Sequence, residues 1–246
     1  MKRSKFIFMA LVLLLVVNLC PGISSAQSGP EINTGADIVS RYVWRGTDFW
    51  AAPNIQPSLS IGYAGLELGV WGAYTLANNT EETDEIDTWL SYTYNIENSV
   101  SITVLATDYY FPNTGIKWGN FNDYDNDDGP GAHTIELGAG ITGPEAFPLS
   151  VFGYINVYND EGNNAYFQAD YPFQVKETEL NVFIGAASGS EDNPDYYGTD
   201  DLQVINLGVR AERDIKISGD FTLPLSVSFI MNPNIEVSYL VLGFSL

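Results

Sequence analysis

The residues that could bind a ligand are mostly acidic, and the densest group of them lies near the middle of the chain. Asp123, Asp125, Asp127 and Asp128 follow one another closely there. Alternating carboxylates can converge on one hard cation when the backbone turns sharply, as in calcium loops. However, the sixth position, usually glycine, is Asp128, and the twelfth, usually a bidentate acid, is Thr134. The sequence therefore predicts at most weak Ca²⁺ binding at these four aspartates and no other cofactor.

A second set of charged residues lies within segments that alternate polar and apolar positions. It comprises Arg41, Arg45, Glu67, Asp87, Glu136, Arg210 and Glu212. In an extended strand, Arg41 and Arg45 would share a face with Val39 and Val43. If these charges face an enclosed lumen, they could form a constriction that selects solutes by charge. The alternative is a structural network of ion pairs, because a buried charge needs a partner in any case.

Catalysis would have to use His133, the only histidine. Outer-membrane lipases place a serine two residues from their histidine, but Ile135 stands at that position here. A serine from elsewhere in the chain is still open as a partner, because triads are defined by geometry and not by spacing. We expect His133 to cap a strand at the rim of the fold, and we expect no enzymatic activity.

Composition excludes several other classes of protein. The 246 residues carry 10 Lys+Arg against 31 Asp+Glu, a formal net charge of −21, which argues against nucleic acid as a partner. One cysteine and one histidine exclude a disulfide framework and most metal cages. With 45% hydrophobic and 13% aromatic residues, the chain is too apolar for a disordered protein.

The first 26 residues have the pattern of a cleaved signal peptide. Lys2, Arg3 and Lys5 precede an apolar run from Phe6 to Val17, which is too short to span a bilayer as a helix. Small residues around Ala26 predict cleavage before Gln27. A lipoprotein modified at Cys20 is the alternative, but Leu19 precedes it where a small residue is expected.

The rest of the chain alternates with a period of two residues, as strands with one apolar and one polar face do. The pattern is clear in 56–63, 66–74, 99–109 and 134–142. The polar face is small and uncharged in many places, the connections alternate between short and long acidic ones, and the sequence ends on a strand. These features favour a transmembrane antiparallel up-and-down β-barrel, so the fold class is all-β.

We count about 12 strands, with 10 or 14 as alternatives. The expected strands span 36–46, 55–63, 66–75, 84–94, 99–110, 133–142, 149–158, 164–172, 179–187, 202–213, 219–230 and 235–246. Residues 27–35 would form a short N-terminal segment and 36–246 the barrel. A soluble β-sandwich shows the same alternation and stays the alternative architecture.

Aromatic residues gather near the expected strand ends, where amphipathic rings favour the boundary between lipid and water. They include Tyr42, Trp44, Tyr63, Tyr74, Tyr92, Tyr94, Tyr109, Tyr171 and Phe173. A second aromatic group is expected on the inward face and could fill the lumen. It consists of Trp71, Trp89, Phe152, Tyr154 and Phe183.

The run Ser40-Arg41-Tyr42-Val43-Trp44-Arg45-Gly46, followed by Pro53 and Gln56, resembles the opening of a known family. This is the TorF-type outer-membrane porin family, whose members are often described only as conserved hypothetical β-barrel proteins. The paired glycines expected after the glutamine are replaced by Pro57 and Ser58. The resemblance implies a barrel that acts as a channel and supplies no catalytic residues.

The sequence thus predicts an exported protein of the Gram-negative type of outer membrane. Its expected function is a passive, cation-preferring, porin-like channel for small solutes. The alternative is a plugged structural or adhesive barrel without transport. Expected partners are outer-membrane lipid, lipopolysaccharide and the barrel-assembly machinery, which would engage the C-terminal strand; the oligomeric state is left open.

Overall fold

A computed structural model describes residues 29–77, 84–97, 99–124, 129–189 and 196–246. The chain divides into two compact units, residues 1–30 and 31–246, and every described strand belongs to the second. The predicted signal peptide, residues 1–26, and Cys20 lie outside the described residues. In the described part of the chain, no helix is long and apolar enough to cross a membrane.

Twelve strands close into one antiparallel barrel, so the all-β class and the count of 12 are confirmed and the sandwich is wrong. The wall runs in the order β1-β14-β13-β12-β11-β10-β9-β8-β7-β6-β5-β4, and β4 pairs back with β1. The strands are β1 (Glu31–Val39), β4 (Asn54–Tyr63), β5 (Leu66–Thr75), β6 (Glu85–Asn95), β7 (Ser101–Tyr110), β8 (His133–Thr142), β9 (Ser150–Tyr158), β10 (Ala165–Val175), β11 (Thr178–Ser188), β12 (Leu202–Lys216), β13 (Thr222–Asn232) and β14 (Val237–Ser245).

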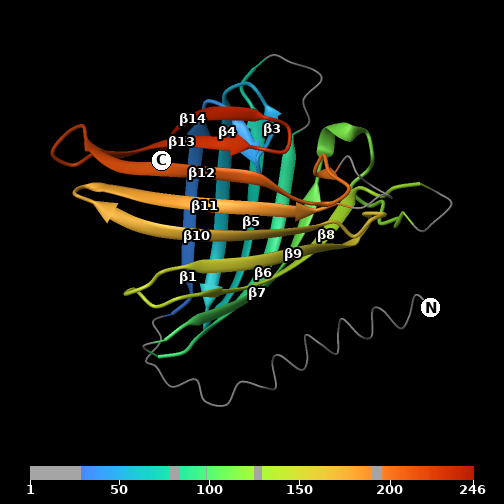
Figure 1. Cartoon of the computed structure of the whole chain (residues 1–246), viewed down its shortest axis with the longest axis horizontal. Coiled ribbons are helices and arrows are strands. Elements are labelled where there is room, and N and C mark those ends of the chain that lie inside the picture. Colours follow the sequence, from blue (N-terminus) through green and yellow to red (C-terminus); the bar gives the residue numbers. More distant parts are fainter. Residues whose placement is uncertain (1–28, 78–83, 98, 125–128, 190–195) are drawn as a thin grey trace. The chain divides into compact units, whose positions relative to one another are not determined.

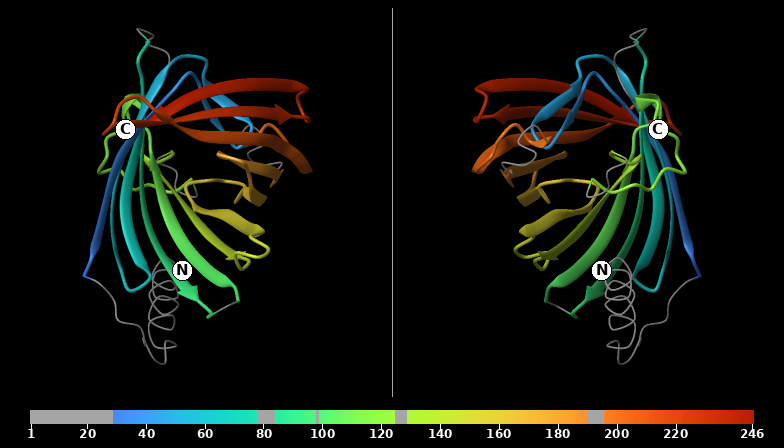
Figure 2. Two further views of the ribbon diagram at one scale, coloured as in Figure 1. Left: turned by 90° about the vertical axis from the view of Figure 1, so that its left-hand side faces the viewer. Right: turned by 90° about the vertical axis from the view of Figure 1, so that its right-hand side faces the viewer.

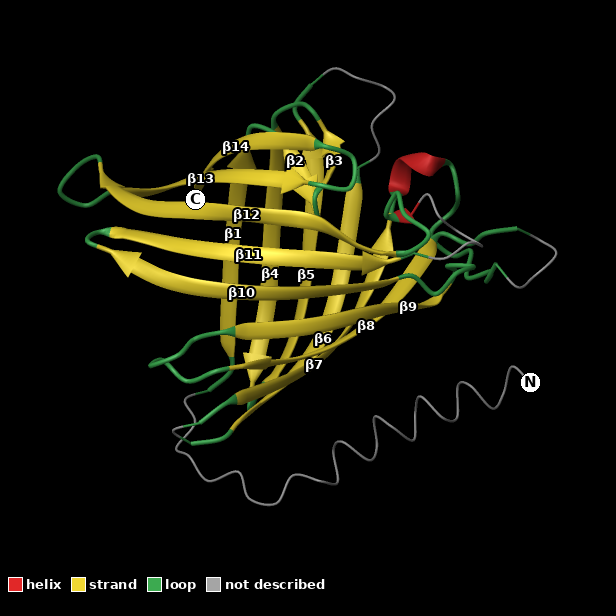
Figure 3. Cartoon of the chain, viewed as in Figure 1, coloured by secondary structure: helices red, strands yellow, loops and turns green. Residues whose placement is uncertain are grey.

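The strands on opposite walls of the barrel cross steeply. In Figure 1, β10 to β12 cross over β1, β4 and β5, and the side views in Figure 2 separate these groups into different walls. Such tilt follows from closing a twisted sheet on itself. Strands and their connections make up nearly all of the described chain, together with the short 3₁₀ helix Pro112–Thr114 (Figure 3).

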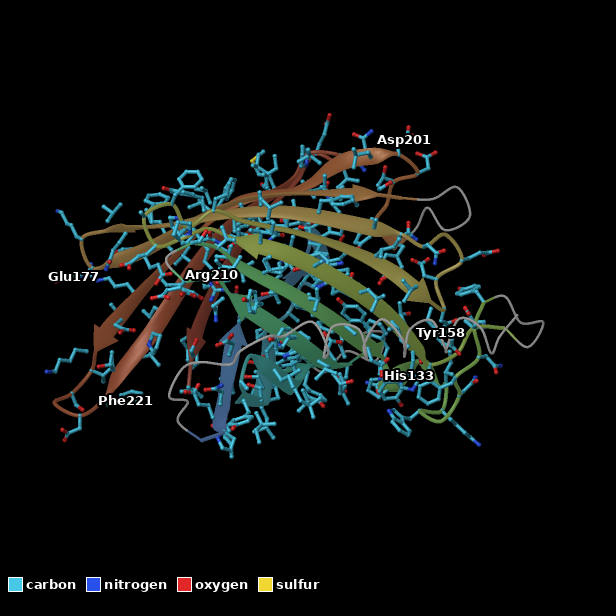
Figure 4. All side chains as sticks on the ribbon, turned by 90° about the horizontal axis from the view of Figure 1, so that it is seen from below. His133, Tyr158, Glu177, Asp201, Arg210 and Phe221 are labelled. Carbon is cyan, nitrogen blue, oxygen red and sulfur yellow. The ribbon has the colours of Figure 1, made fainter. Side chains whose placement is uncertain are left out.

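The two ends of the barrel differ in their connections. Glu177 and Phe221, from two of the short turns, lie at one end, which we call the turn end (Figure 4). His133, Tyr158 and Asp201, beside the longer connections, lie at the other, the loop end (Figure 4).

The period-two pattern places apolar side chains on the outside of the wall. Leu68 is 56% exposed and Leu240 is 60% exposed, and other large apolar residues of the strands are comparably open. The opposite face holds polar partners, since the Trp89 indole donates to the Glu67 carboxylate at 2.8 Å and the hydroxyls of Thr93 and Thr103 lie 2.9 Å apart. The outside of the barrel is therefore apolar and its lumen polar.

The first expected strand, 36–46, is wrong in its second half. The barrel strand β1 starts earlier, at Glu31, and ends at Val39, after which β2 (Tyr42–Trp44) and β3 (Thr47–Trp50) form a separate two-stranded hairpin. Arg45 and Gly46 form its two-residue turn with φ of 49° and 78°. Positive φ at both central residues is the requirement of the tightest hairpin turns. Arg41 and Arg45 therefore do not share a strand face with Val39 and Val43.

The barrel closes along a short seam. Strands β1 and β14 pair through Asp37↔Ser245, Ile38↔Phe244 and Val39↔Gly243, whereas β10 and β11 pair along their whole length. Backbone hydrogen bonds between Ala36 and Leu246, and from the Ser40 N–H to the Leu242 carbonyl, extend the seam by a residue or so at each end. The Ser245 hydroxyl adds a hydrogen bond to the Asp37 carboxylate at 2.6 Å. This seam joins the two ends of the wall.

Leu68→Arg should destabilise the folded barrel in lipid by about 2–4 kcal/mol, because the substitution places a charge on the apolar outer face. The control is Ser91→Arg, because Ser91 pairs across the ladder with Glu67 on the polar face and the new charge can find a partner there. Urea titration of each variant folded into vesicles measures its free energy of unfolding. Equal losses for the two variants would contradict the assignment of the faces.

Candidate functional site

The β2–β3 hairpin packs against the inner side of one wall. Tyr42 and Trp50 are buried against Ala73 of β5, together with Trp71, and the Tyr42 and Trp50 rings stack with centroids 4.7 Å apart. Burial raises the pKa of the Tyr42 phenol well above its ordinary value, and the nearby Glu85 and Asp87 carboxylates raise it further. The base of the hairpin is thus anchored by aromatic packing.

The tip of the hairpin meets other strands. The Gly46 carbonyl accepts a hydrogen bond from the Asn232 side chain of β13 at 3.1 Å. A Cβ atom on Gly46 would lie 1.8 Å from the carbonyl oxygen of Ile205 in β12, so only glycine can approach the wall this closely. The hairpin therefore reaches from β5 to β12 and β13 across the interior of the barrel.

Arg45, at the hairpin turn, forms a buried ion pair with Glu136 of β8. One guanidinium nitrogen lies 2.5 Å from Glu136 Oε2 and the other lies 2.9 Å from Oε1, so the contact is bidentate. The Tyr109 hydroxyl of β7 donates to Glu136 Oε1 at 2.9 Å, and Arg45 also donates to the Tyr197 hydroxyl at 2.5 Å. Both charges are thereby satisfied away from water.

Aromatic rings complete the surroundings of the guanidinium. Its carbon lies 4.4 Å from the ring centroid of Trp44, 4.6 Å from that of Tyr154 and 4.4 Å from that of Tyr166. At these distances the ring faces attract the cation. Burial alone would lower the pKa of Arg45, but Tyr197, Tyr109 and the hydrogen-bonded Glu136 outweigh it and hold this pKa well above its ordinary value.

We call Arg45, Glu136 and the rings around them the septum, because these rings border two cavities. The larger cavity, of about 570 Å³, is bordered by Tyr154. The smaller one, of about 350 Å³, is bordered by Trp44 and Tyr109. The rings of the septum therefore form part of the lining of both cavities.

The larger cavity carries more negative than positive charge. Asp170, Glu179, Glu212 and Arg210 line it, and Arg210 forms an ion pair with Glu212. Gln168 and Asn181 donate hydrogen bonds to the Asp170 carboxylate. These hydrogen bonds fix the position of the Asp170 carboxylate in the acidic lining of the cavity.

The charged residues predicted for one constriction are spread along the lumen. Two pairs are in contact, Arg45 with Glu136 and Arg210 with Glu212. Glu67 instead accepts a hydrogen bond from the Trp89 indole. Asp87 lies across the ladder from Trp71. Arg41 lies beside the hairpin, 3.4 Å from Asp48, with its guanidinium over the Tyr239 ring. A role of the set in selecting solutes stays a prediction.

Three aromatic residues of the hairpin and the septum do not lie where the sequence pattern predicts them. Tyr42, Trp44 and Tyr109 were assigned to the boundary between lipid and water, yet Tyr42 and Tyr109 are buried inside the barrel and Trp44 faces Arg45. The alternation in the sequence does indicate an inward-facing Tyr109, because Tyr109 shares its period-two face with Thr103 and Thr107. The roles of Tyr166 and Tyr197 were missed, because nothing in the sequence shows that a hairpin brings a cation to them.

His133 is buried at the loop end of β8. Its Nδ1 lies 2.9 Å from the Asp108 carboxylate, its Nε2 lies 2.6 Å from the Trp118 carbonyl oxygen, and the Phe121 ring stacks on it at 4.0 Å. Within the described ranges, neither ring nitrogen has a hydroxyl as its partner. The arrangement fastens the connection after β7 to the wall, and it offers no nucleophile next to the histidine.

The predicted calcium loop lies mostly outside the described residues, which include Asp123 but not Asp125, Asp127 or Asp128. The Asp123 carboxylate accepts a hydrogen bond from the backbone N–H of Asn159 at 3.0 Å. Among the residues that the structure describes, no three histidine, cysteine or acidic side chains gather as a metal site would require. Calcium binding therefore stays a prediction.

Comparison with known families gives one match that spans most of the chain. A model for a family of bacterial proteins of unknown function, Gcw_chp, matches residues 24–222. The chain belongs to the Gcw_chp family. This membership covers the septum residues as well as β1 to β12.

Two further comparisons add little to the Gcw_chp match. Curated proteins give no match. Among solved structures, the chain is similar to the crystal structure of Pseudomonas aeruginosa OccD3 (OpdP), with 11% identity and a TM-score of 0.42 over 91% of this chain and 66% of that one. The fold of this Gcw_chp member is established by its own strand pairing.

In this Gcw_chp chain, Gly46→Ala should release the hairpin tip from the wall, because φ is positive there and the added methyl group would collide with Ile205. We expect weaker near-ultraviolet circular dichroism from the packed aromatic rings and an unchanged barrel band in a heat-modifiability gel. Gly119→Ala, where nothing lies within 4 Å of the added Cβ, is the control. If both variants keep the wild-type spectrum, the hairpin does not depend on this contact.

Proposed function

We propose that this chain is an outer-membrane β-barrel that works as a porin-like passive channel for small solutes, with the β2–β3 hairpin as an internal plug. The observation that carries the proposal is a polar lumen that holds two cavities, both bordered by rings of the septum. A solid structural barrel would have no need of the two cavities. The function is transport by diffusion and includes no chemical step.

A membrane location is supported by the outer face of the wall. Leu68, Leu240 and their neighbours would expose an apolar surface larger than soluble monomers normally carry. A closed barrel pairs its strands all around, which is what a sheet needs in hydrocarbon. The short turns at one end and the longer connections at the other match the periplasmic and external ends of outer-membrane barrels. Residues 1–26 would direct export.

A preference for cations is supported by the charges that line the lumen. Asp170, Glu179 and Glu212 border the larger cavity and Glu85 borders the smaller one, against Arg210. Exposed acidic residues also stand in the described connections at the loop end, among them Glu161, Asp200 and Asp201. A pore and a mouth of one sign concentrate counter-ions and disfavour anions.

A second candidate function is a structural or adhesive barrel whose lumen never opens. The hairpin favours it, since the hairpin is anchored on β5 by buried rings and on β13 by Asn232. The two functions differ in electrical behaviour, because a channel conducts in discrete steps and a permanent plug is silent.

Arg45→Ala should raise the single-channel conductance several-fold over that of the wild type in a planar bilayer, because the septum loses the group that binds the hairpin to Glu136. The substitution should also increase the preference for cations over anions, measured from reversal potentials. Arg213→Ala is the control, because Arg213 is an exposed arginine that pairs with Glu177 at a short turn. Silence of the wild type and of Arg45→Ala would favour the structural barrel.

Three further parts of this proposal stand on the sequence. They are Ca²⁺ at Asp123, Asp125, Asp127 and Asp128, the link to TorF-type porins through residues 40–46, and the partners lipid, lipopolysaccharide and assembly machinery. A thermal-shift titration tests the first, since millimolar Ca²⁺ without effect on the melting temperature would remove it.

A further inference from the structure

We propose that the shell around the Arg45 side chain is a binding site for a guanidinium-bearing solute, and that Arg45 is its built-in occupant. The inference rests on the proposed channel function and names the class of solute that this channel recognises. When the hairpin withdraws, the place of its guanidinium becomes free for the guanidinium of a solute in transit.

The shell fits a guanidinium in both charge and shape. Glu136 accepts two hydrogen bonds in a fork, which matches the planar arrangement of guanidinium donors better than a round ammonium ion. The rings of Tyr154 and Tyr166 and the indole of Trp44 offer their faces at 4.4–4.6 Å. A carboxylate with several aromatic faces is the general composition of a cation site in proteins.

Most of the shell belongs to the wall of the barrel and not to the hairpin. Tyr109, Glu136, Tyr154 and Tyr166 come from the neighbouring strands β7, β8, β9 and β10. Arg45 and Trp44 come from the hairpin, which is anchored elsewhere, on β5 and β13. The site therefore has a fixed part that remains when its occupant leaves.

The fixed part is held in position by its own contacts. The Tyr166 hydroxyl donates to Gln168 at 2.5 Å and accepts from the Asn206 amide at 2.9 Å. The same ring lies so close to Gly185 that a Cβ there would be 2.0 Å from the hydroxyl oxygen. The Tyr109 hydroxyl fixes one oxygen of Glu136. A vacant shell would thus keep the geometry that now binds Arg45.

The shell borders open space in two cavities. Tyr154 borders the cavity that carries Asp170, Glu179 and Glu212, and Tyr109 borders the cavity that carries Glu85. The three carboxylates of the larger cavity outnumber Arg210 there and attract positive charge toward the septum. In the proposed channel, the shell is therefore a binding site along the path of a cation and not a closed pocket.

The test removes the Arg45 side chain by the substitution Arg45→Ala and then adds a free guanidinium compound in solution. Methylguanidinium chloride should bind Arg45→Ala in detergent, measured by calorimetry, and should reduce the conductance of this variant in a bilayer toward the wild-type level. Potassium chloride at the same ionic strength should do neither. The double variant Arg45→Ala/Glu136→Gln should bind methylguanidinium about tenfold or more weakly, since a charge-assisted hydrogen-bond pair is lost.

The outcomes separate this proposal from the channel itself. If Arg45→Ala conducts and methylguanidinium binds it no better than it binds the double variant, the cation site is wrong and the channel stands. If methylguanidinium binds but no variant conducts, the site stands and the channel is wrong. Arg45→Gln, which keeps most of the side-chain volume, takes the place of Arg45→Ala if the latter gives no heat-modifiable barrel.

Discussion

A guanidinium that leaves water must find a carboxylate, and this requirement ties the interior of the barrel together. Arg45 stands on a hairpin that is not part of the wall, and Glu136 stands on β8, so their bidentate contact joins two pieces that share no backbone ladder. Removal of either partner would leave the other charge buried without compensation. The tyrosines around the pair add ring faces and hydroxyls, and rings of the group border two cavities of the lumen.

The wall obeys a simpler constraint than the septum does, and this difference decided what could be predicted. In β8 the alternation of Ile135, Leu137 and Ala139 with Glu136 and Gly138 gave the strand bounds that the structure has, His133–Thr142. Each such strand only has to turn one face to an apolar surrounding and one to a polar lumen. Period and turn residues are local properties, so they can be recognised without any knowledge of the partners.

The septum depends on contacts between residues far apart in the chain, and there the pattern gave less. The alternation predicts a continuous strand through Arg45 and Gly46, but in the structure both residues have positive φ and form a two-residue turn. Once the hairpin folds inward, Trp44 and Tyr109 lie beside a buried cation and not at a membrane boundary. Periodicity identified Glu136 as inward-facing, but its partner depends on a turn whose direction the sequence does not reveal.

The short seam between β1 and β14 has a consequence for the way in which the molecule comes into being. Asp37 and Ser245, which meet there, are 208 positions apart, so their contact closes a loop that contains nearly the whole wall. Neighbouring hairpins such as β10–β11 can form as soon as their own residues are synthesised, but the cylinder cannot be completed before β14 exists. Until that moment β1 and β14 both present free hydrogen-bonding edges, and such edges pair readily with other chains. An escort that covers these two strands during biogenesis would therefore protect the nascent sheet where it is most prone to aggregate.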